Sequence, residues 1–339
     1  MIPHNLPMLG PDEQSATARV LASGWVAQGP EVDAFEQGLC RFLGLPEGHA
    51  VVVSSGSAAL YLALWALGGQ GRRVGLPVYA CAALRNAVGL VGGTPVYLDC
   101  ADGSPNLDVA LADRAGLDIL IAPSMYGLPV PVRQQRGYAV VEDVAQSLGA
   151  AVSGERIGIR GEVGICSFYA TKLMTTGGQG GAVVSRDRTL IDAVRDYRQF
   201  DCRPDRELRF NFQMTDLQAA VGRVQLERLP DFILRREQLF SIYQRAGLDL
   251  LDDPQTEPVR YRAVLRTVVA DKVIAALAEA GVRAIVPVER WELLDDAARY
   301  PVAAALTGQT VSLPLYPSLA DADAVRIAAI VKAAIKEAA

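Results

Sequence analysis

From about residue 50, short apolar runs alternate with helix-forming stretches, and this alternation limits the fold more than any other feature of the chain. Stretches such as 57–67 and 80–91, which are amphipathic or rich in Ala and Leu, separate the apolar runs. The runs that read as buried strands are 50–53, 73–76, 95–98, 119–122, 139–141, 165–168 and 182–185. Strands that alternate with helices pair in parallel and are covered by helices. The sequence therefore predicts an α/β fold on a mostly parallel, seven-stranded sheet.

Helical patterns also precede and follow this sheet. The stretches 11–23 and 31–43 end at Gly24 and Gly44, and glycine commonly caps the end of a helix. After Thr215 the sequence predicts a long helix over 216–246, broken at Pro230 because proline lacks a backbone donor.

The C-terminal third has a different pattern of predicted strands and helices. It contains β-rich runs at 260–269 and 284–288 and helical patterns at 271–280 and 321–338. We therefore predict a large domain over residues 1–230, which includes the N-terminal helices, and a smaller C-terminal α+β domain over residues 231–339.

Composition argues against several classes of protein. The net charge is −5 and no basic cluster occurs, so neither a nucleic-acid partner nor an anionic membrane surface is expected. The first residues lack the pattern of a signal peptide, and no apolar run has the length of a membrane span. Five irregularly spaced cysteines indicate reduced thiols and a cytoplasmic protein. With only His4 and His49 present, a multi-histidine metal site is excluded.

The first predicted strand leads directly into small residues at the start of a helix. These are Ser54, Ser55, Gly56, Ser57 and Ala58. Backbone N–H groups at a helix start, with a hydroxyl beside them, can bind an anion such as a phosphate. A tight turn that merely requires small residues would give the same pattern.

A second segment places carboxylates after the strand at 139–141. Glu142 and Asp143 stand there, followed by Ala145 and Gln146. Ligands of open α/β sheets bind at the carboxyl ends of strands. An ionised Asp in that position can keep a pyridinium nitrogen protonated, although the same carboxylates could instead cap a following helix.

The third segment contains a lone lysine, Lys172. It lies between the apolar run that includes Ser167 and a glycine-rich stretch at 177–181. An apolar, buried setting favours the neutral amine of a lysine, which is the form that attacks a carbonyl carbon. The glycines would let the backbone pass close to a bulky ligand. A solvated loop lysine is the alternative.

In this order, the three segments resemble fold-type-I pyridoxal-phosphate (PLP) enzymes of the aspartate aminotransferase superfamily, and in particular the DegT-type (StrS-type) sugar aminotransferase family. Three further stretches resemble motifs of that family: 23–36 its opening motif, 208–220 its asparagine-containing segment, and 312–319 its closing motif. The resemblance runs nearly from end to end. It implies a large PLP-binding domain with a smaller C-terminal domain.

The resemblance also implies roles for individual residues. Lys172 would form the Schiff base with pyridoxal 5′-phosphate and move the proton, and Asp143 would pair with the pyridine nitrogen. The other cofactor-binding residues would be Ala145 beneath the ring, Gln146 near its 3-hydroxyl, and Gly56, Ser57, Ala58 and Ser167 around the phosphate. Asn211 would reach the phosphate of the neighbouring subunit, so that the active unit is a homodimer with shared sites. The loop at 24–29 would help to form the substrate cleft.

Several positions depart from the family pattern. Cys81 stands where many members stack an aromatic residue on the cofactor ring; it could contact the ring directly, or Tyr79 could compensate. Leu173, Gln213 and Glu289 replace a frequent Asn, Arg and His of the family. These departures concern the substrate side more than the cofactor side.

The resemblance implies an aminotransferase that moves an amino group from an amino acid, such as glutamate, to a keto group of a nucleotide-linked sugar or related polyol. The reaction would be ping-pong through pyridoxamine phosphate. Two alternatives are a PLP enzyme that acts on a non-sugar ketone or catalyses elimination in a specialised pathway, and a non-catalytic regulatory protein. The presence of Lys172 argues against elimination, and the presence of both Lys172 and Asp143 argues against a loss of catalysis.

Overall fold

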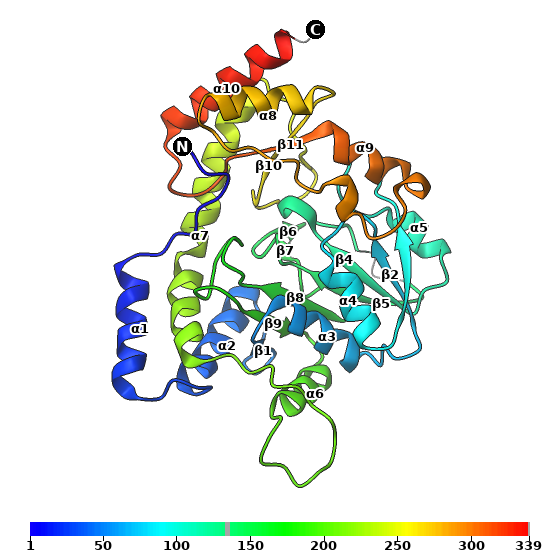
Figure 1. Cartoon of the computed structure of the whole chain (residues 1–339). Helices are drawn as coiled ribbons and strands as arrows, with labels where there is room; N and C mark the ends of the chain where they lie inside the picture. Colours follow the sequence, from blue (N-terminus) through cyan, green and yellow to red (C-terminus); the bar gives the residue numbers. More distant parts are fainter. Residues whose placement is uncertain (133–135, 338–339) are drawn as a thin grey trace.

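The computed structural model describes residues 1–132 and 136–337. Its centre is a seven-stranded sheet of order β1-β9-β8-β5-β4-β2-β3 (Figure 1). The strands are β1 (Ala50–Val53), β2 (Arg73–Pro77), β3 (Thr94–Leu98), β4 (Ile119–Pro123), β5 (Ala139–Asp143), β8 (Val163–Ser167) and β9 (Gly181–Val184). Each predicted run therefore forms a strand at nearly the expected bounds, and the predicted α/β fold is confirmed.

One strand departs from the parallel arrangement. β9 runs antiparallel to both of its neighbours, β1 and β8, whereas the other paired strands are parallel. Gly181 at the start of β9 is the register partner of both Val53 and Ser167. The carboxyl ends of β1 and β8 are thus held on either side of one glycine. A Cβ at Gly181 would lie 2.4 Å from the carbonyl oxygen of Ser55.

Helices cover both faces of the sheet, and the strand residues alternate between two cores (Figure 1). Val51 and Val53 pack with α3 (Gly56–Ala66) and α4 (Ala83–Leu90). Ala50 and Val52 face the opposite way, toward α2 (Pro30–Leu43). This alternation is the period-two pattern expected of a strand buried on both sides. Three other helices of this part are α1 (Pro11–Ser23), α5 (Val109–Arg114) and α6 (Arg188–Arg198).

The predicted break at Pro230 is wrong. The helix α7 runs without interruption from Asp216 to Arg245, with Pro230 on its exposed side. Its first half buries Leu226 and Leu229 against the large core, and its second half buries Leu239 in the C-terminal core. Burial on both sides of the proline offsets the one backbone hydrogen bond that proline cannot make.

The C-terminal part consists of α8 (Ala270–Glu279), α9 (Pro301–Gln309), α10 (Asp321–Lys336) and an antiparallel pair, β10 (Ala263–Arg266) with β11 (Thr310–Leu313). The predicted strand at 260–269 is thus shorter than expected, and the run at 284–288 contributes only an isolated bridge between Ile285 and Ser312. β11 was not predicted. The end of the predicted helix at 321–338 lies partly outside the described residues.

A hydrophobic cluster joins the second half of α7 to α8, α10, β10 and β11, which lie together beyond one edge of the large sheet (Figure 1). The division into domains over residues 1–230 and 231–339 remains a prediction. The shorter elements are β6 (Ala151–Val152), β7 (Glu155–Arg156) and the 3₁₀ turns η1 (Met125–Gly127), η2 (Arg290–Glu292) and η3 (Ala297–Arg299).

Within residues 1–132 and 136–337, no helix combines the length and the apolar character that crossing a bilayer requires. The same residues contain no group of three or more side chains suited to hold a metal ion. All five cysteines are free.

Candidate active site

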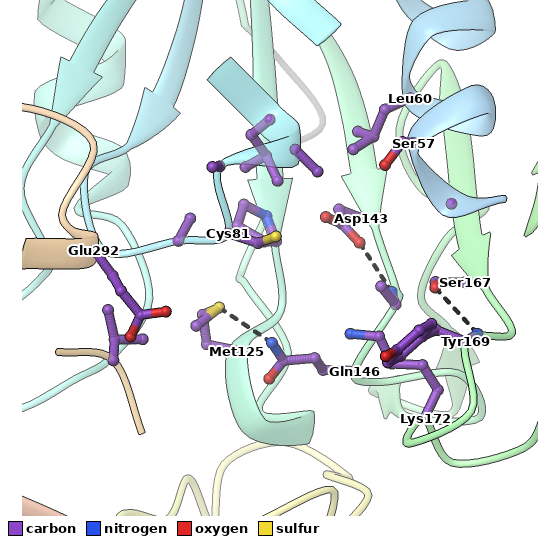
Figure 2. Close-up of a pocket in the computed structure, with 18 of the residues that line it drawn as sticks. Ser57, Leu60, Cys81, Met125, Asp143, Gln146, Ser167, Tyr169, Lys172 and Glu292 are labelled. Carbon is purple, nitrogen blue, oxygen red and sulfur yellow. Dashed lines mark hydrogen bonds between the residues drawn. The ribbon is translucent and has the colours of Figure 1, made fainter. Parts of the chain in front are cut away.

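A cavity of about 650 Å³ lies at the carboxyl edge of the sheet. Its walls come from the start of α3, the loops after β2 and β4, the ends of β5 and β8, and two C-terminal segments around residues 261 and 291. The predicted site residues that line it are Gly56, Ser57, Cys81, Asp143, Ala145, Gln146, Ser167 and Lys172. In Figure 2, Ser57, Ser167 and Lys172 lie on one side of the cavity and Glu292 on the other.

The predicted phosphate turn is the start of α3. Ser55 is the N-cap, and its Oγ accepts a hydrogen bond from the N–H of Ala58 at 3.1 Å. Ala58 does not line the cavity, and its N–H is already used in this cap. The N–H groups of Gly56 and Ser57 belong to the first turn, where no intrahelical acceptor exists. The hydroxyl of Ser167 at the end of β8 lies beside them, so close that a Cβ at Gly56 would be 2.9 Å from it.

Asp143 ends β5 and is almost completely buried. Its Oδ1 accepts the N–H of Ala145 at 2.9 Å. Burial raises the pKa of Asp143, while the hydrogen bond from Ala145 and the charge of Lys172 act in the opposite direction. The carboxylate is therefore an acceptor in a dry setting that would be stabilised by a nearby positive charge.

Gln146 is oriented by the loop after β4. Its Oε1 accepts the N–H of Tyr126 at 2.8 Å, and its Nε2 has only a weak contact, 3.8 Å, with the sulfur of Met125. The amide N–H groups thus have capacity for a better acceptor in the cavity. Tyr126 has a left-handed φ of 59°, and a Cβ at the next residue, Gly127, would overlap the carbonyl oxygen of Val259. The loop is therefore packed directly against the C-terminal segment.

Lys172 lies in the loop after β8, in a turn in which its N–H donates to the carbonyl oxygen of Tyr169 at 2.9 Å. Its Nζ is 5.4 Å from the centre of the Tyr261 ring, and it has no carboxylate at ion-pair distance within the described residues. The glycine-rich stretch does not line the cavity, except at Gln179. It folds back on the lysine loop instead: the N–H of Ala170 donates to the carbonyl oxygen of Gly178, whose φ of 151° favours glycine. The expectation that these glycines approach a ligand stays a prediction, since none of them lines this cavity.

Tyr261 and Arg262 form a wall of the cavity that the sequence did not predict. Burial alone would raise the pKa of Tyr261, but the charges of Lys172 and Arg262 and a hydrogen bond with Thr171 lower it. Other lining residues missed from the sequence are Tyr169, Trp291 and Glu292. Tyr169 could have been recognised from its place between Ser167 and Lys172, whereas Tyr261 and Trp291 stand in no motif.

The departures from the family pattern fall in different places. Cys81 is exposed and lines the cavity. Tyr79 does not line it: the side chain is fully buried, and its hydroxyl is 2.8 Å from the hydroxyl of Tyr126. The suggestion that Tyr79 compensates for Cys81 is therefore wrong. Gln213 and Glu289 do not line the cavity, whereas Leu173 is buried beneath the lysine loop.

Asn211 and the loop at 24–29 also lie outside this cavity. Asn211 is in the segment between α6 and α7, which projects away from the body of the molecule (Figure 1). The N–H of Gly29 in the other loop donates to Asp216 at 2.8 Å, at the start of α7.

Comparison with known proteins gives consistent matches. Residues 7–332 match the model of the DegT/DnrJ/EryC1/StrS aminotransferase family. The erythromycin biosynthesis sensory transduction protein EryC1 of Saccharopolyspora erythraea is 35% identical, over 95% of this chain and 95% of that protein. The dTDP-3-amino-3,4,6-trideoxy-alpha-D-glucose transaminase of Streptomyces venezuelae is 33% identical, over 93% and 90% of the two chains. The crystal structure of the aminotransferase TlmJ from Streptoalloteichus hindustanus superposes with a TM-score of 0.91 at 28% identity, covering both chains completely.

Proposed function

Because the chain belongs to the DegT/DnrJ/EryC1/StrS aminotransferase family and is an aminotransferase, we propose that it transfers an amino group from an amino acid, with glutamate as the preferred donor, to the keto group of a nucleotide-linked sugar. The observation that carries this proposal is the shared cavity. It brings the start of α3, Asp143 and Lys172 together at one edge of the sheet.

The residues of the cavity fit pyridoxal phosphate, the cofactor that the family implies. A volume of about 650 Å³ is within the range of roughly 300–1,000 Å³ that is typical of small-ligand sites. The free N–H groups of Gly56 and Ser57 and the hydroxyl of Ser167 suit a phosphate. Asp143, whose pKa is raised by its burial, suits a protonated pyridine nitrogen. Lys172 lines the same cavity and would supply the amine for the aldehyde.

When bound, pyridoxal phosphate supplies an aldehyde that carries the amino group and a ring that withdraws electrons from the reacting carbon. The chain's own residues do the rest. The Nζ of Lys172 takes the proton from the donor's α-carbon in the first half-reaction. In the second half-reaction it delivers a proton to the former carbonyl carbon of the acceptor. Asp143 would hold a proton on the ring nitrogen, and the Nε2 of Gln146 would donate a hydrogen bond to an acceptor on the ring. The wall of Tyr261 limits the access of water to Lys172.

A sugar acceptor is supported by the Streptomyces venezuelae relative, whose name specifies a dTDP-linked amino sugar. The surface on which such an acceptor would lie is supplied by Pro287, Val288, Trp291, Glu292, Leu293 and Leu294. This surface offers the exposed indole of Trp291 and the carboxylate of Glu292. An aromatic face and a hydrogen-bond acceptor are suited to a sugar ring, which presents C–H groups on its faces and hydroxyl groups on its edge.

We propose further that the enzyme is a cytoplasmic homodimer in which Asn211 reaches the cofactor phosphate of the partner. The segment that carries Asn211 exposes two large apolar side chains, Leu208 at 96% and Phe210 at 65%. Exposed apolar side chains on a projecting segment are suited to a contact with a second copy of the chain. The segment ends at the predicted phosphate turn, where the N–H of Ser54 donates to the carbonyl oxygen of Phe212 at 2.9 Å. The free cysteines agree with a reducing compartment.

The test of the function uses purified protein loaded with pyridoxal phosphate. Addition of glutamate should deplete the absorbance band of the lysine-bound cofactor, and a panel of keto-sugar nucleotides should restore it with formation of an amino sugar. Lys172→Ala should lack the lysine-bound band and be inactive, whereas Lys272→Ala, at an exposed position on α8, should behave as the wild type. A band that is unchanged in Lys172→Ala, or that no amino donor depletes, would contradict the proposal.

A further inference from the structure

The peptide group that joins Thr171 to Lys172 is held at both of its ends. Its N–H, which belongs to Lys172, donates to the carbonyl oxygen of Tyr169 at 2.9 Å. Its carbonyl oxygen, which belongs to Thr171, accepts a hydrogen bond from Nδ2 of Asn5 at 2.8 Å. Among residues 1–132 and 136–337, Asn5 is the only donor to that oxygen. One end of the peptide group is therefore fixed from within the loop, and the other by a residue 166 positions away in the sequence.

Asn5 is brought to this loop by an N-terminal segment, residues 2–5, that is attached to the C-terminal part of the molecule. The N–H of Ile2 donates to the carbonyl oxygen of Gly281 at 2.8 Å. The Nε2 of His4 is 2.8 Å from Oγ of Ser312 on β11. These contacts hold the segment in place without the side chain of Asn5, which is left to bind the Thr171 carbonyl.

Asn5 acts beside the active-site cavity and not inside it. It lines a separate, smaller cavity of about 130 Å³, and it does not line the large one. Thr171 lines both cavities. Any effect of Asn5 on the chemistry therefore passes through the backbone of Thr171 and Lys172, since the amide of Asn5 is directed at that backbone.

The orientation of this peptide group sets the direction in which the side chain of Lys172 leaves the backbone. A peptide group is planar, so it can turn about the axis between its two Cα atoms only if the hydrogen bonds at its N–H and C=O are distorted. Because Nζ is five bonds from Cα, a rotation of about 10° at Cα moves Nζ by roughly 1 Å. A displacement of about 1 Å at a reacting group can reduce a rate about 100-fold.

We propose that Asn5 is a positioning residue for Lys172: its amide holds the Thr171 carbonyl and thereby keeps Nζ directed into the active-site cavity during both half-reactions. This inference rests on the proposed function. In that function Lys172 is attached to the cofactor, is released when the amino donor enters, and returns at the end of the cycle. The four-carbon stem of a lysine is flexible, so its backbone anchor is the part that stays constant while Nζ leaves and returns.

The experiment uses the holoenzyme and observes the lysine-bound cofactor directly. Asn5→Leu keeps the approximate shape of the side chain and removes its amide. The induced circular dichroism of the lysine-bound band, which reports the orientation of the bound ring, should change. Glutamate should deplete the band about 10- to 100-fold more slowly in single-turnover mixing. The glutamate concentration that gives half the maximal rate should stay within about threefold, because Asn5 does not line the active-site cavity.

The matched control is Ser312→Ala. It removes the 2.8 Å contact with His4 but leaves the hydrogen bond from Asn5 to Thr171 in place. Both variants should unfold at a lower urea concentration than the wild type, since each loses one side-chain hydrogen bond of the N-terminal segment. Ser312→Ala should nevertheless keep the wild-type dichroism and depletion rate. Asn5→Gln retains an amide donor on a longer side chain and should recover part of the rate lost in Asn5→Leu.

A wild-type dichroism and depletion rate in Asn5→Leu would refute the inference. Equal slowing in Asn5→Leu and Ser312→Ala would also refute it, because that pattern identifies a general loosening of the N-terminal segment. If Asn5→Leu does not fold, Asn5→Gln carries the test and should deplete the band more slowly than Ser312→Ala does. A wild type that forms no lysine-bound band would overturn the proposed function itself. Failure of every keto-sugar acceptor would overturn only the acceptor assignment, because these measurements require the amino donor alone.

Discussion

The contact between Gly56 and Ser167 tests whether the start of α3 and the end of β8 form one phosphate-binding surface. A Cβ at Gly56 would lie 2.8 Å from Cβ and 2.9 Å from Oγ of Ser167. Ordinary van der Waals contact begins at 3.4 Å, so Gly56→Ala must separate the two segments by several tenths of an ångström. The backbone at Gly56 is helical, so alanine adds no backbone strain. Overpacking of a filled site typically costs about 1–3 kcal/mol.

We expect Gly56→Ala to raise the Kd for pyridoxal phosphate about tenfold or more, which corresponds to about 1.4 kcal/mol per factor of ten. The apoprotein should also unfold at lower denaturant concentration. The Kd is measured by spectral titration of the apoprotein, and the unfolding by urea. The control is Gly89→Ala, inside α4, where an added Cβ would meet nothing within 4 Å. This control should be neutral or more stable by up to about 1 kcal/mol. If Gly56→Ala binds the cofactor as tightly as Gly89→Ala does, the two segments do not hold the phosphate together.

Two further predictions concern buried carboxylates. Asp143→Asn should reduce the turnover of the holoenzyme by about 10²-fold or more, because the ring nitrogen loses its anionic partner. In the apoprotein the same change should be stabilising at neutral pH. Since burial raises the pKa of Asp143, the unfolded chain ionises first, and stability falls as the pH rises from the unfolded pKa through the folded one. Thermal unfolding of apoprotein from pH 4 to 8 would contradict this if Asp143→Asn kept the wild-type slope. Glu36→Gln should destabilise the fold by about 3–5 kcal/mol, because the buried carboxylate pairs with Arg198 at 2.5 Å and Arg195 at 2.6 Å. Asp249→Asn, which breaks the exposed pair with Arg266, should cost less than about 1 kcal/mol in the same urea titration.

The parts of the fold that could be predicted from the sequence are those that local signals encode. Alternating apolar runs located all seven strands of the large sheet, and glycines located the ends of α1 and α2, where Gly24 and Gly44 adopt left-handed φ angles of 74° and 73°. The same holds for the cofactor side of the cavity. Asp143 ends β5, Ser57 and Lys172 follow within a few residues of β1 and β8, and the carboxyl ends of these strands meet at one edge because of the strand order.

The errors share a physical cause, since each depends on partners that are distant in the sequence. Pro230 breaks isolated helices, but here α7 is packed at both ends by different cores. β11 was not predicted because its residues, Thr310–Leu313, become a strand through pairing with β10, more than forty residues earlier. The sequence also did not predict that the glycines at 177–181 fold the chain back against residues 168–170.

The two halves of the cavity differ in how well the sequence predicts them, again because one half depends on partners that are distant in the sequence. The cofactor half is built from the ends of neighbouring strands, so short motifs describe it well. The substrate half is built from Tyr261, Arg262 and the segment 287–294, whose positions depend on how the C-terminal part packs against the loop at Tyr126. The N–H of Tyr261 donates to the carbonyl oxygen of Tyr126 at 3.2 Å, and that of Val259 to Gly127 at 3.1 Å. A substitution in this contact, such as one at Gly127, would shift Arg262 relative to Lys172 without touching either residue. We therefore expect substrate preference in this protein to depend on packing between distant segments, and cofactor binding to depend on local turns.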